Sequence, residues 1–335
     1  MDPVTQAVRV ALERFGLSQR RLLVAVSGGL DSTVLLHCVT ALAAEMQLEV
    51  MVGHVNHGLR GEESDGDQAA VESLAKGLGV ACRVARVDVG HARVGHSSRT
   101  RPTPQEAARN VRHEALTAMA REAGFHHIAT AHHLDDQAET VLLRVIRGAS
   151  VDGLRGITPS DEQGLFVRPV LKATRAELAE YALDNRLTWR EDSSNASDRY
   201  TRNWLRHQVI PGLEKNINPR LNRALGRVAE AHERDATWIA GLVDDAYEAR
   251  VSVRPDGGFD IAKRGWSAVP EALALRLVAR LLSEVGSGRD LSMAHLERAL
   301  AFLCEGPGAH GGREIELPGG VRLRREKTAF HIYRK

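Results

Sequence analysis

Short runs of aliphatic and β-branched residues alternate with amphipathic stretches of helical length between Leu22 and about Ala131. This alternation is typical of repeated βαβ units on a parallel sheet. We therefore predict an α/β fold with a Rossmann-like parallel sheet. The predicted strands are residues 22–26, 49–55, 82–87 and 127–131, and the predicted helices are residues 32–46, 62–77, 104–123 and 135–147.

The alternation weakens after Pro159, and we predict an irregular stretch that ends near Pro211. Later segments again repeat apolar positions at helical spacing, at residues 220–250, 267–285 and 292–304. The last stretch, residues 313–333, alternates apolar and polar positions around a Pro-Gly-Gly turn, which predicts a β-hairpin. Because 335 residues at ~150 per domain indicate about two domains, we predict an α/β domain over residues 1–215. A smaller, mainly helical domain that ends in the hairpin should occupy residues 216–335.

Composition places the chain among ordinary globular proteins, with 43% hydrophobic and 26% charged residues. A net charge of +2 argues neither for nor against a polyanionic partner. Cys38, Cys82 and Cys304 are odd in number and widely spaced, which fits reduced thiols in the cytosol better than a disulfide framework. No apolar run reaches the ~18 residues of a membrane span. We expect a cytoplasmic protein with no membrane partner.

A glycine turn follows the first predicted strand and leads directly into an apolar helix. Its sequence is Ser27-Gly28-Gly29-Leu30-Asp31-Ser32-Thr33. Glycines let backbone N–H groups approach an anion, and the hydroxyls and the positive helix end can complete a phosphate cradle. The alternative is a simple tight turn in which Asp31 caps the helix. The Gly-Lys-Ser/Thr of a Walker A loop is missing, which disfavours a γ-phosphoryl transferase of that type.

Asp31 is the unusual member of this loop, because a carboxylate beside a polyphosphate is repulsive unless a cation lies between them. Its natural role is a direct or water-mediated contact with Mg²⁺. The sequence therefore predicts a polyphosphate with Mg²⁺ at this loop, and Asp31 as the metal contact.

Two further segments carry polar residues where the fold binds ligands. His54 begins the sequence His-Val-Asn-His-Gly-Leu-Arg at the end of the second predicted strand, at the carboxyl edge of the sheet. Glu106, Arg109 and Arg112 recur every three residues on the third predicted helix. Their spacing is equally compatible with a solvated ladder of charges.

The fourth predicted strand runs into Ala129-Thr130-Ala131-His132-His133-Leu134-Asp135-Asp136-Gln137-Ala138-Glu139-Thr140. Asp136 and Glu139 share a helical face, which suits the binding of a cation such as an amine. Two alternatives stay open: acidic residues in a first turn are stabilised by the helix dipole alone, and the histidines and aspartates could bind a metal ion.

Arg202 and Arg206 fall one turn apart on a later helical segment, with Asn203 and His207 beside them. Such a face suits phosphate groups. An exposed basic helix would have the same spacing.

In order along the chain, these segments resemble the tRNA(Ile)-lysidine synthetase family of PP-loop N-type ATP pyrophosphatases. The resemblance covers roughly the first two thirds of the chain. Ser-Gly-Gly-Leu-Asp-Ser is similar to the PP-loop. The His54 segment, the Glu-x-x-Arg-x-x-Arg helix, the block around Asp136, and Glu-Asp-x-Ser-Asn followed by Arg-Asn-x-x-Arg are similar to the remaining family motifs.

The resemblance implies a ligase whose substrates are ATP, free L-lysine and tRNA(Ile) with the anticodon CAU. The wobble cytidine would be adenylated at its C2 oxygen with release of pyrophosphate, and the lysine ε-amine would displace AMP to give lysidine. Residues 1–215 would form the PP-loop catalytic domain and residues 216–335 a tRNA-contacting domain. A homodimer stays open as the assembly.

The resemblance also implies roles for individual residues. Ser27, Gly28, Gly29, Leu30, Asp31 and Ser32 would bind ATP together with His54, and Asp31 would contact Mg²⁺. Arg112, Asp136 and Glu139 would orient lysine, with Asp136 accepting the amine's proton. His132, Arg202 and Arg206 would line the reaction site.

Some features depart from the family or lie outside its motifs. His113 stands where Tyr is more usual, and residues 91–104 form a basic loop that looks like an insertion. Arg322, Arg324, Arg325 and Lys327 form a basic cluster suited to RNA phosphates or to a solvated strand face. A PP-loop tRNA thiolase and a non-catalytic ATP-binding regulator are the competing functions, although isolated cysteines disfavour the thiolase.

Overall fold

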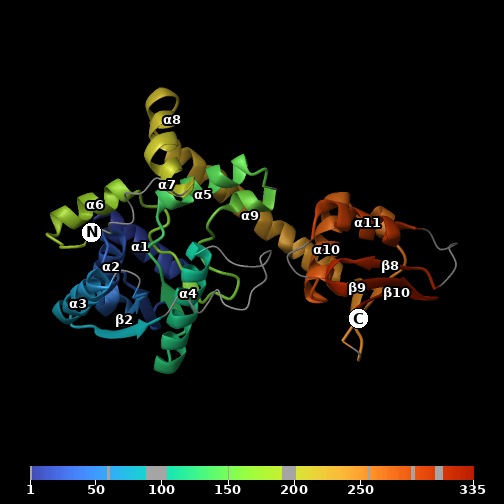
Figure 1. Ribbon diagram of the computed structural model, residues 1–335, viewed down its shortest axis with the longest axis horizontal. Coiled ribbons are helices and arrows are strands. Elements are labelled where there is room, and N and C mark those ends of the chain that lie inside the picture. The colour runs from blue at the N-terminus through green and yellow to red at the C-terminus, as the bar shows by residue number, and fades with distance from the viewer. Residues whose placement is uncertain are drawn as a thin grey trace. The chain divides into compact units, whose positions relative to one another are not determined.

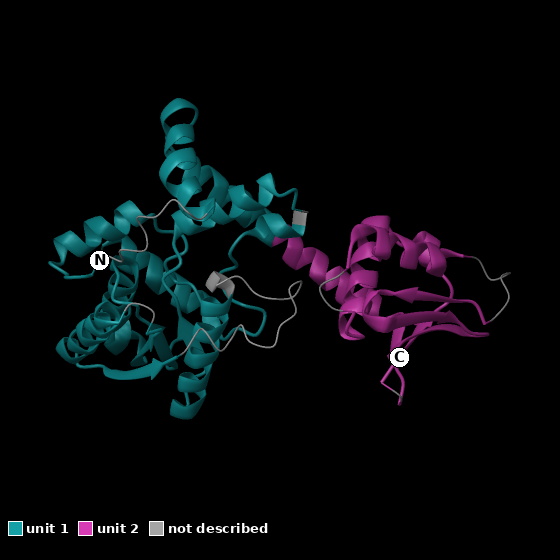
Figure 2. Cartoon of the chain, in the orientation of Figure 1, with its two compact units in different colours: residues 1–233 teal, residues 234–335 magenta. Residues whose placement is uncertain are grey.

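The chain divides into two compact units, residues 1–233 and 234–335 (Figure 2). The computed structural model describes residues 2–58, 61–87, 104–149, 151–190, 201–255, 257–287, 291–305 and 312–335. The division comes later than the boundary predicted between residues 215 and 216. The reason is that the following segment still packs on the first unit: Asn222 donates a hydrogen bond to Asp135, and Gly226 lies against Leu134.

The first unit contains a five-stranded parallel sheet in the order β3-β2-β1-β4-β5 (Figure 1). The strands are β1 (Arg21–Ala25), β2 (Glu49–Asn56), β3 (Ala81–Arg86), β4 (His127–Ala129) and β5 (Phe166–Val167). The sheet confirms the predicted Rossmann-like α/β fold. The chain moves from β1 to one side and later returns to the other side with β4, so the order of strands reverses at β1.

Helices cover both faces of this sheet, as a parallel sheet requires. Alternation along β1 sends Leu22 and Val24 into one core and Leu23 into the other. The first core also receives α1 (Pro3–Arg14), α2 (Leu30–Met46), α3 (Glu62–Gly77) and α6 (Arg175–Asp184). The opposite core receives α4 (Pro104–Ala123). Helix α5 (Leu134–Ile146) follows β4 directly and leads to the 3-10 turn η2 (Val151–Arg155).

The stretch predicted to be irregular after Pro159 is in fact partly regular. It contains β5, α6, α7 (Thr201–Trp204), the π-helical turn η4 (Leu205–Val209) and the start of α8 (Ile210–Asn216). Strand β5 has only two residues and so leaves no periodic pattern. Helix α6 did carry a signal, because Thr174 and Glu177 form a capping box at its start.

The second unit combines helices with an antiparallel sheet in the order β6-β7-β10-β9-β8. Helix α9 (Leu221–Glu248) begins in the first unit and ends in this one. The other elements are α10 (Glu271–Glu284), α11 (Met293–Cys304), the short turns η5 (Trp266–Ala268) and η7 (Pro318–Gly320), β6 (Val251–Val253), β7 (Phe259–Ala262), β8 (Glu314–Leu317), β9 (Val321–Arg325) and β10 (Ala329–Arg334). The predicted hairpin is confirmed as β8 and β9, joined by η7. The sheet is larger than predicted.

No helix in the part of the chain that the structure describes is long and apolar enough to cross a bilayer.

Gly53 of β2 provides a test of the packing between the sheet and α4. A methyl group at Gly53 would lie 2.7 Å from the Leu23 side chain and 3.1 Å from that of Leu116. We expect Gly53→Ala to lower the free energy of unfolding by about 1–3 kcal/mol through overpacking. Urea denaturation followed by circular dichroism measures the effect. Gly77→Ala is the control, because nothing lies within 4 Å of that position. Equal midpoints for both variants and the wild type would contradict the packing described.

Candidate active site

Charged and polar residues gather where β1, β4 and β5 end. Of the predicted residues, the Ser27 loop follows β1, and His132 and Asp136 follow β4; Arg168, which was not predicted, follows β5. Since parallel neighbouring strands end at the same edge, the topology brings these segments together. The edge lies at the reversal of strand order, which is where open α/β sheets bind ligands.

The glycine loop has the conformation of a phosphate cradle. Gly28 has φ +93°, a region that favours glycine, and Gly29 is the N-cap of α2. The Ser32 hydroxyl donates to the Gly29 carbonyl at 3.0 Å and accepts from the Ser27 amide at 3.2 Å. Leu30 and Asp31 begin the helix, so the first-turn N–H groups of α2 have no hydrogen-bond acceptor within the helix. The loop therefore offers backbone donors and hydroxyls to an anion.

Asp31 lies in the first turn of α2 and does not cap it. One of its oxygens, Oδ2, lies 3.6 Å from His133 Nε2, and the other, Oδ1, is buried without a hydrogen-bond partner among the described residues. Burial lowers the pKa of His133, but Asp135, Asp31 and Asp136 outweigh it and raise that pKa to about 10. A protonated His133 therefore holds the carboxylates together. The unpartnered Asp31 oxygen fits a cation contact.

Asp136 and Glu139 lie side by side on α5 as predicted, and both are already paired with arginine. Glu139 is 1% exposed; its oxygens accept from Arg202 Nε at 2.8 Å and from Arg206 Nε at 2.5 Å. Asp136 Oδ1 accepts from Arg206 Nη2 at 3.1 Å, while Oδ2 accepts from the His133 amide at 3.2 Å. The structure thus joins four predicted residues into one network, and the contact with the His133 amide also caps α5.

The network changes the chemistry available to Asp136. Burial raises the pKa of this carboxyl, but the charges of His133 and Arg202 outweigh it, so that its pKa lies below the usual range. A carboxylate with a lowered pKa accepts protons weakly and binds cations well. An amine that reached Asp136 or Glu139 would have to take the place of a guanidinium group.

His132 is influenced both by this network and by a group of arginines. Its Nδ1 is 3.0 Å from the Thr130 hydroxyl. Burial lowers the pKa of His132 to about 3; Asp136 opposes the shift, whereas Arg168, Arg109 and Arg112 add to it. The imidazole is therefore neutral at pH 7. Arg112 was predicted to belong to the site, but Arg168 was missed, although it directly follows the buried pair Phe166-Val167 at a strand end.

His54 lies at the end of β2 as predicted and is 4% exposed. Its Nδ1 lies 2.8 Å from the Val26 carbonyl, so this nitrogen carries a proton and donates it. The opposite nitrogen, Nε2, is buried without a hydrogen-bond partner among the described residues. It can accept a hydrogen bond from an amino group of a ligand.

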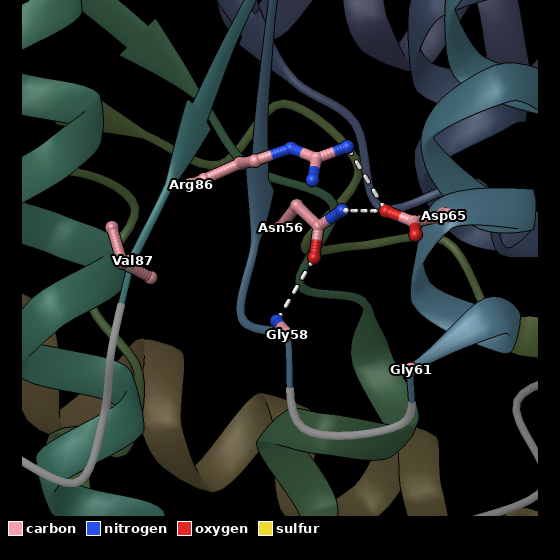
Figure 3. Close-up of a pocket in the computed structure, with 6 residues that line it drawn as sticks. All are labelled: Asn56, Gly58, Gly61, Asp65, Arg86 and Val87. Carbon is pink, nitrogen blue, oxygen red and sulfur yellow. Dashed lines mark hydrogen bonds and ion pairs between the residues drawn. The ribbon is translucent and has the colours of Figure 1, made fainter.

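A separate polar cavity of about 460 Å³ opens where β2 and β3 end, lined by Asn56, Gly58, Gly61, Asp65, Arg86 and Val87. In Figure 3, Arg86 and Asn56 both reach Asp65, at 3.0 and 3.3 Å, and Asn56 Oδ1 accepts from the Gly58 amide at 2.9 Å. These polar groups already satisfy one another. The charged residues at the ends of β1, β4 and β5 therefore form the stronger candidate site.

Several predicted segments lie outside the described residues. They are Leu59 and Arg60, nearly all of the basic loop at residues 91–104, Ser150, and residues 191–195; the side chain of Glu106 belongs with them.

In the basic cluster of the C-terminal strands, Arg322 and Arg324 are consistent with the solvated strand face that was one of the two interpretations, whereas Arg325 differs from both. Arg325 is 1% exposed and donates to the Glu305 carbonyl. Arg322 and Arg324 both pair with Glu314, at 2.7 and 2.9 Å. The alternating strand pattern shows which side chains share a face, but the sequence alone did not reveal that Glu314 lies opposite the arginines. This face is an ion-pair network of the unit.

Comparisons with known proteins agree with this geometry. A family model described as a PP-loop domain matches residues 3–213. A tRNA(Ile)-lysidine synthase of Clostridium perfringens is 34% identical over 302 residues, which covers 90% of this chain and 62% of the relative. One of Solibacter usitatus is 35% identical and covers 90% and 65%. One of Chlorobaculum tepidum is 39% identical over 209 residues and covers 62% and 61%.

The chain therefore spans less than two thirds of the length of these curated relatives. Among solved structures, the U34-tRNA thiolase NcsA from Methanococcus maripaludis with its [4Fe-4S] cluster superposes with a TM-score of 0.56. The match covers 68% of this chain and 77% of that one at 21% identity, so it supports the fold alone.

His113 provides a pH test of the arginine group. It stacks on Phe166 at 4.3 Å, and burial together with Arg109 and Arg112 lowers the pKa of His113 to about 4. The folded protein therefore binds the proton less readily than the unfolded chain, so stability is complete above pH ~6.5 and falls as the pH drops to about 4. We expect His113→Phe to reduce this loss by about 1–3 kcal/mol. Denaturation series between pH 4 and 7 test it, with the exposed His126→Phe as control; parallel losses in all three proteins would contradict it.

Proposed function

The chain belongs to the PP-loop domain family, and on that premise we propose that it is a tRNA(Ile)-lysidine synthetase. In this proposal it joins free L-lysine to C2 of the wobble cytidine in tRNA(Ile) with the anticodon CAU, at the expense of ATP. The relatives' shared name supports the tRNA substrate, and the PP-loop supports the use of ATP.

One observation carries the proposal: the phosphate loop and the paired carboxylates meet through a single histidine. His133 Nε2 lies 3.6 Å from Asp31 of the loop and 3.5 Å from Asp136 of the carboxylate pair. A site for a nucleotide phosphate and a site for a cation are therefore held in contact. An enzyme that activates one substrate with ATP and then adds an amine needs the phosphate site and the cation site next to each other.

In the first step the C2 oxygen of the cytidine attacks the α-phosphorus of ATP, and pyrophosphate leaves. The amides and hydroxyls of Ser27, Gly28, Gly29, Leu30 and Ser32 would hold the phosphates, and His54 Nε2 would accept from the adenine amino group. Asp31 would contact Mg²⁺, which would neutralise phosphate charge when bound. The buried, unpartnered Asp31 oxygen supports this contact.

In the second step the lysine ε-amine forms a bond to C2, and AMP departs with the former C2 oxygen. The amine must lose a proton before it attacks. Asp136 and Glu139 would orient this amine, and Arg202 and Arg206 would release them and face the departing phosphate. The lowered pKa of Asp136 favours orientation over proton acceptance as its main role.

The thiolase alternative receives little support from the cysteines. Cys38 is buried, and burial raises the pKa of its thiol to about 11, so that the reactive thiolate is scarce at neutral pH. Burial also raises the pKa of Cys82. The third, Cys304, belongs to the other unit.

The direct test is transfer of labelled lysine to transcripts of tRNA(Ile) with a CAU anticodon, in the presence of ATP and Mg²⁺. A methionine tRNA with the same anticodon is the control. We expect one lysidine per isoleucine tRNA after digestion to nucleosides and mass analysis, with equal amounts of AMP. Release of AMP and pyrophosphate without lysine transfer would move the chain to a sister activity of the family.

Asp136→Asn separates the two steps. It keeps the shape of the side chain but removes the charge that would bind the amine. We expect pyrophosphate release to persist while lysine transfer falls by about 30-fold, the loss of one charge-assisted contact of about 2 kcal/mol. Asp184→Asn, on the exposed surface of α6, is the control and should transfer lysine normally. Equal transfer by both variants would remove Asp136 from this role.

A further inference from the structure

Arg168 is a buried cation that has no role in the mechanism proposed above. Its side chain lies at the end of β5 and the residue is 7% exposed. Its Nη1 donates to the Thr158 carbonyl at 2.8 Å, and its Nε is buried without a hydrogen-bond partner among the described residues. Buried guanidinium groups are normally paired with an anion, because removing a charge from water is costly.

The surroundings of Arg168 add to its positive charge. Burial lowers the pKa of Arg168, and Arg109 lowers it further; Asp161 alone acts in the opposite direction. The Asp161 carboxylate accepts a hydrogen bond from the Phe166 amide at 3.1 Å. Within the described ranges, no carboxylate lies within ion-pair distance of Arg109, Arg112 or Arg168. Among the described residues, the three arginines therefore form a group of cations without an ion-pair partner.

This group acts on His132 together with a carboxylate. His132 is influenced by Asp136 and also by Arg168, Arg109 and Arg112. Carboxylates that suit an ammonium group and guanidinium groups that suit a carboxylate thus lie around one neutral imidazole. A small molecule that carries both an ammonium and a carboxylate group matches this arrangement.

We propose that Arg168, together with Arg109 and Arg112, binds the α-carboxylate of the free amino acid and is a specificity-determining residue of the reaction. The inference rests on the proposed function, because it takes lysine as the substrate. Guanidinium and carboxylate groups form bidentate hydrogen bonds that a carboxamide cannot reproduce. The burial of Arg168 favours this ligand over a phosphate of the RNA backbone, since a small molecule reaches a buried side chain more readily than a bulky strand does.

The experiment compares L-lysine with L-lysinamide, which replaces the carboxylate by a neutral amide. Both are used as unlabelled competitors in the transfer of labelled lysine to tRNA(Ile). In the wild-type protein we expect lysinamide to compete at least ~10-fold more weakly than lysine, as the loss of a charge-assisted hydrogen bond predicts. In Arg168→Gln the KM for lysine should rise by ~10- to 100-fold, whereas the two competitors should become nearly equal.

Two control variants distinguish a loss of lysine recognition from a defect in folding. Among the described residues, Arg144 donates to the backbone carbonyls of Gly153 and Gly156, so Arg144→Gln removes a structural arginine of the same unit. It should retain the wild-type preference for lysine. Arg168→Lys keeps the charge and should retain part of that preference, which a fold defect would not restore.

Three results would overturn the inference. The wild-type protein could treat lysine and lysinamide alike. Arg168→Gln could keep the wild-type preference. Arg168→Gln could also raise the KM for tRNA or ATP and not that for lysine, which would indicate that the arginines contact a phosphate group. Failure of the proposed function is distinct from these, because the wild-type protein would then transfer no lysine.

Discussion

A buried carboxylate, that of Glu139, must be paired, and this requirement determines where the segment that carries Arg202 and Arg206 lies in the first unit. Glu139 is 1% exposed, and both its oxygens are occupied by guanidinium groups. Breaking a fully buried pair from one side costs about 3–5 kcal/mol. Arg202 and Arg206 are 39% and 31% exposed, so the cost here is smaller, but the pairs still hold both arginines against α5. They lie on consecutive short elements, α7 and η4, in which Leu205 alone is buried. The ion pairs therefore place this segment, and η4 is a π-helical turn of the kind often found at functional sites.

The same need for pairing explains why the site divides into regions of opposite charge. Around His133, the carboxylates of Asp135, Asp31 and Asp136 outweigh burial and raise its pKa to about 10. Around His132, burial lowers the pKa to about 3, and Arg168, Arg109 and Arg112 add to this shift. One of two adjacent histidines is therefore protonated at pH 7 and the other is neutral. The protonated one joins the phosphate loop to the carboxylates.

Much of the fold follows from sequence because its signals are local. The parallel strands β1, β2 and β4 are largely buried runs and β3 is a partly buried edge strand. The helices between them repeat apolar residues, so the positions of these elements were confirmed. The signals fail where an element is too short to repeat. Strand β5 has two residues and pairs with β4 through Ile128 and Ala129. Strand β6 has three residues, too few for an alternating pattern, and is formed by its pairing with β7. Pairing across the sheet, which no local pattern encodes, creates these strands.

The candidate site shows the same limit in its chemistry. The sequence supplied Asp136, Glu139, Arg202 and Arg206 as separate motifs, 63 residues apart for Arg202 and Glu139. Helical spacing predicts neighbours within a motif but not the partners between motifs, so the carboxylates were read as free to bind an amine. Arg168 was missed for a related reason: it is a single charged residue, with no second charged residue at a regular spacing to mark it as part of a motif. What makes Arg168 distinctive is the burial of a cation without an ion-pair partner among the described residues, and burial by distant elements becomes visible only when the chain is folded.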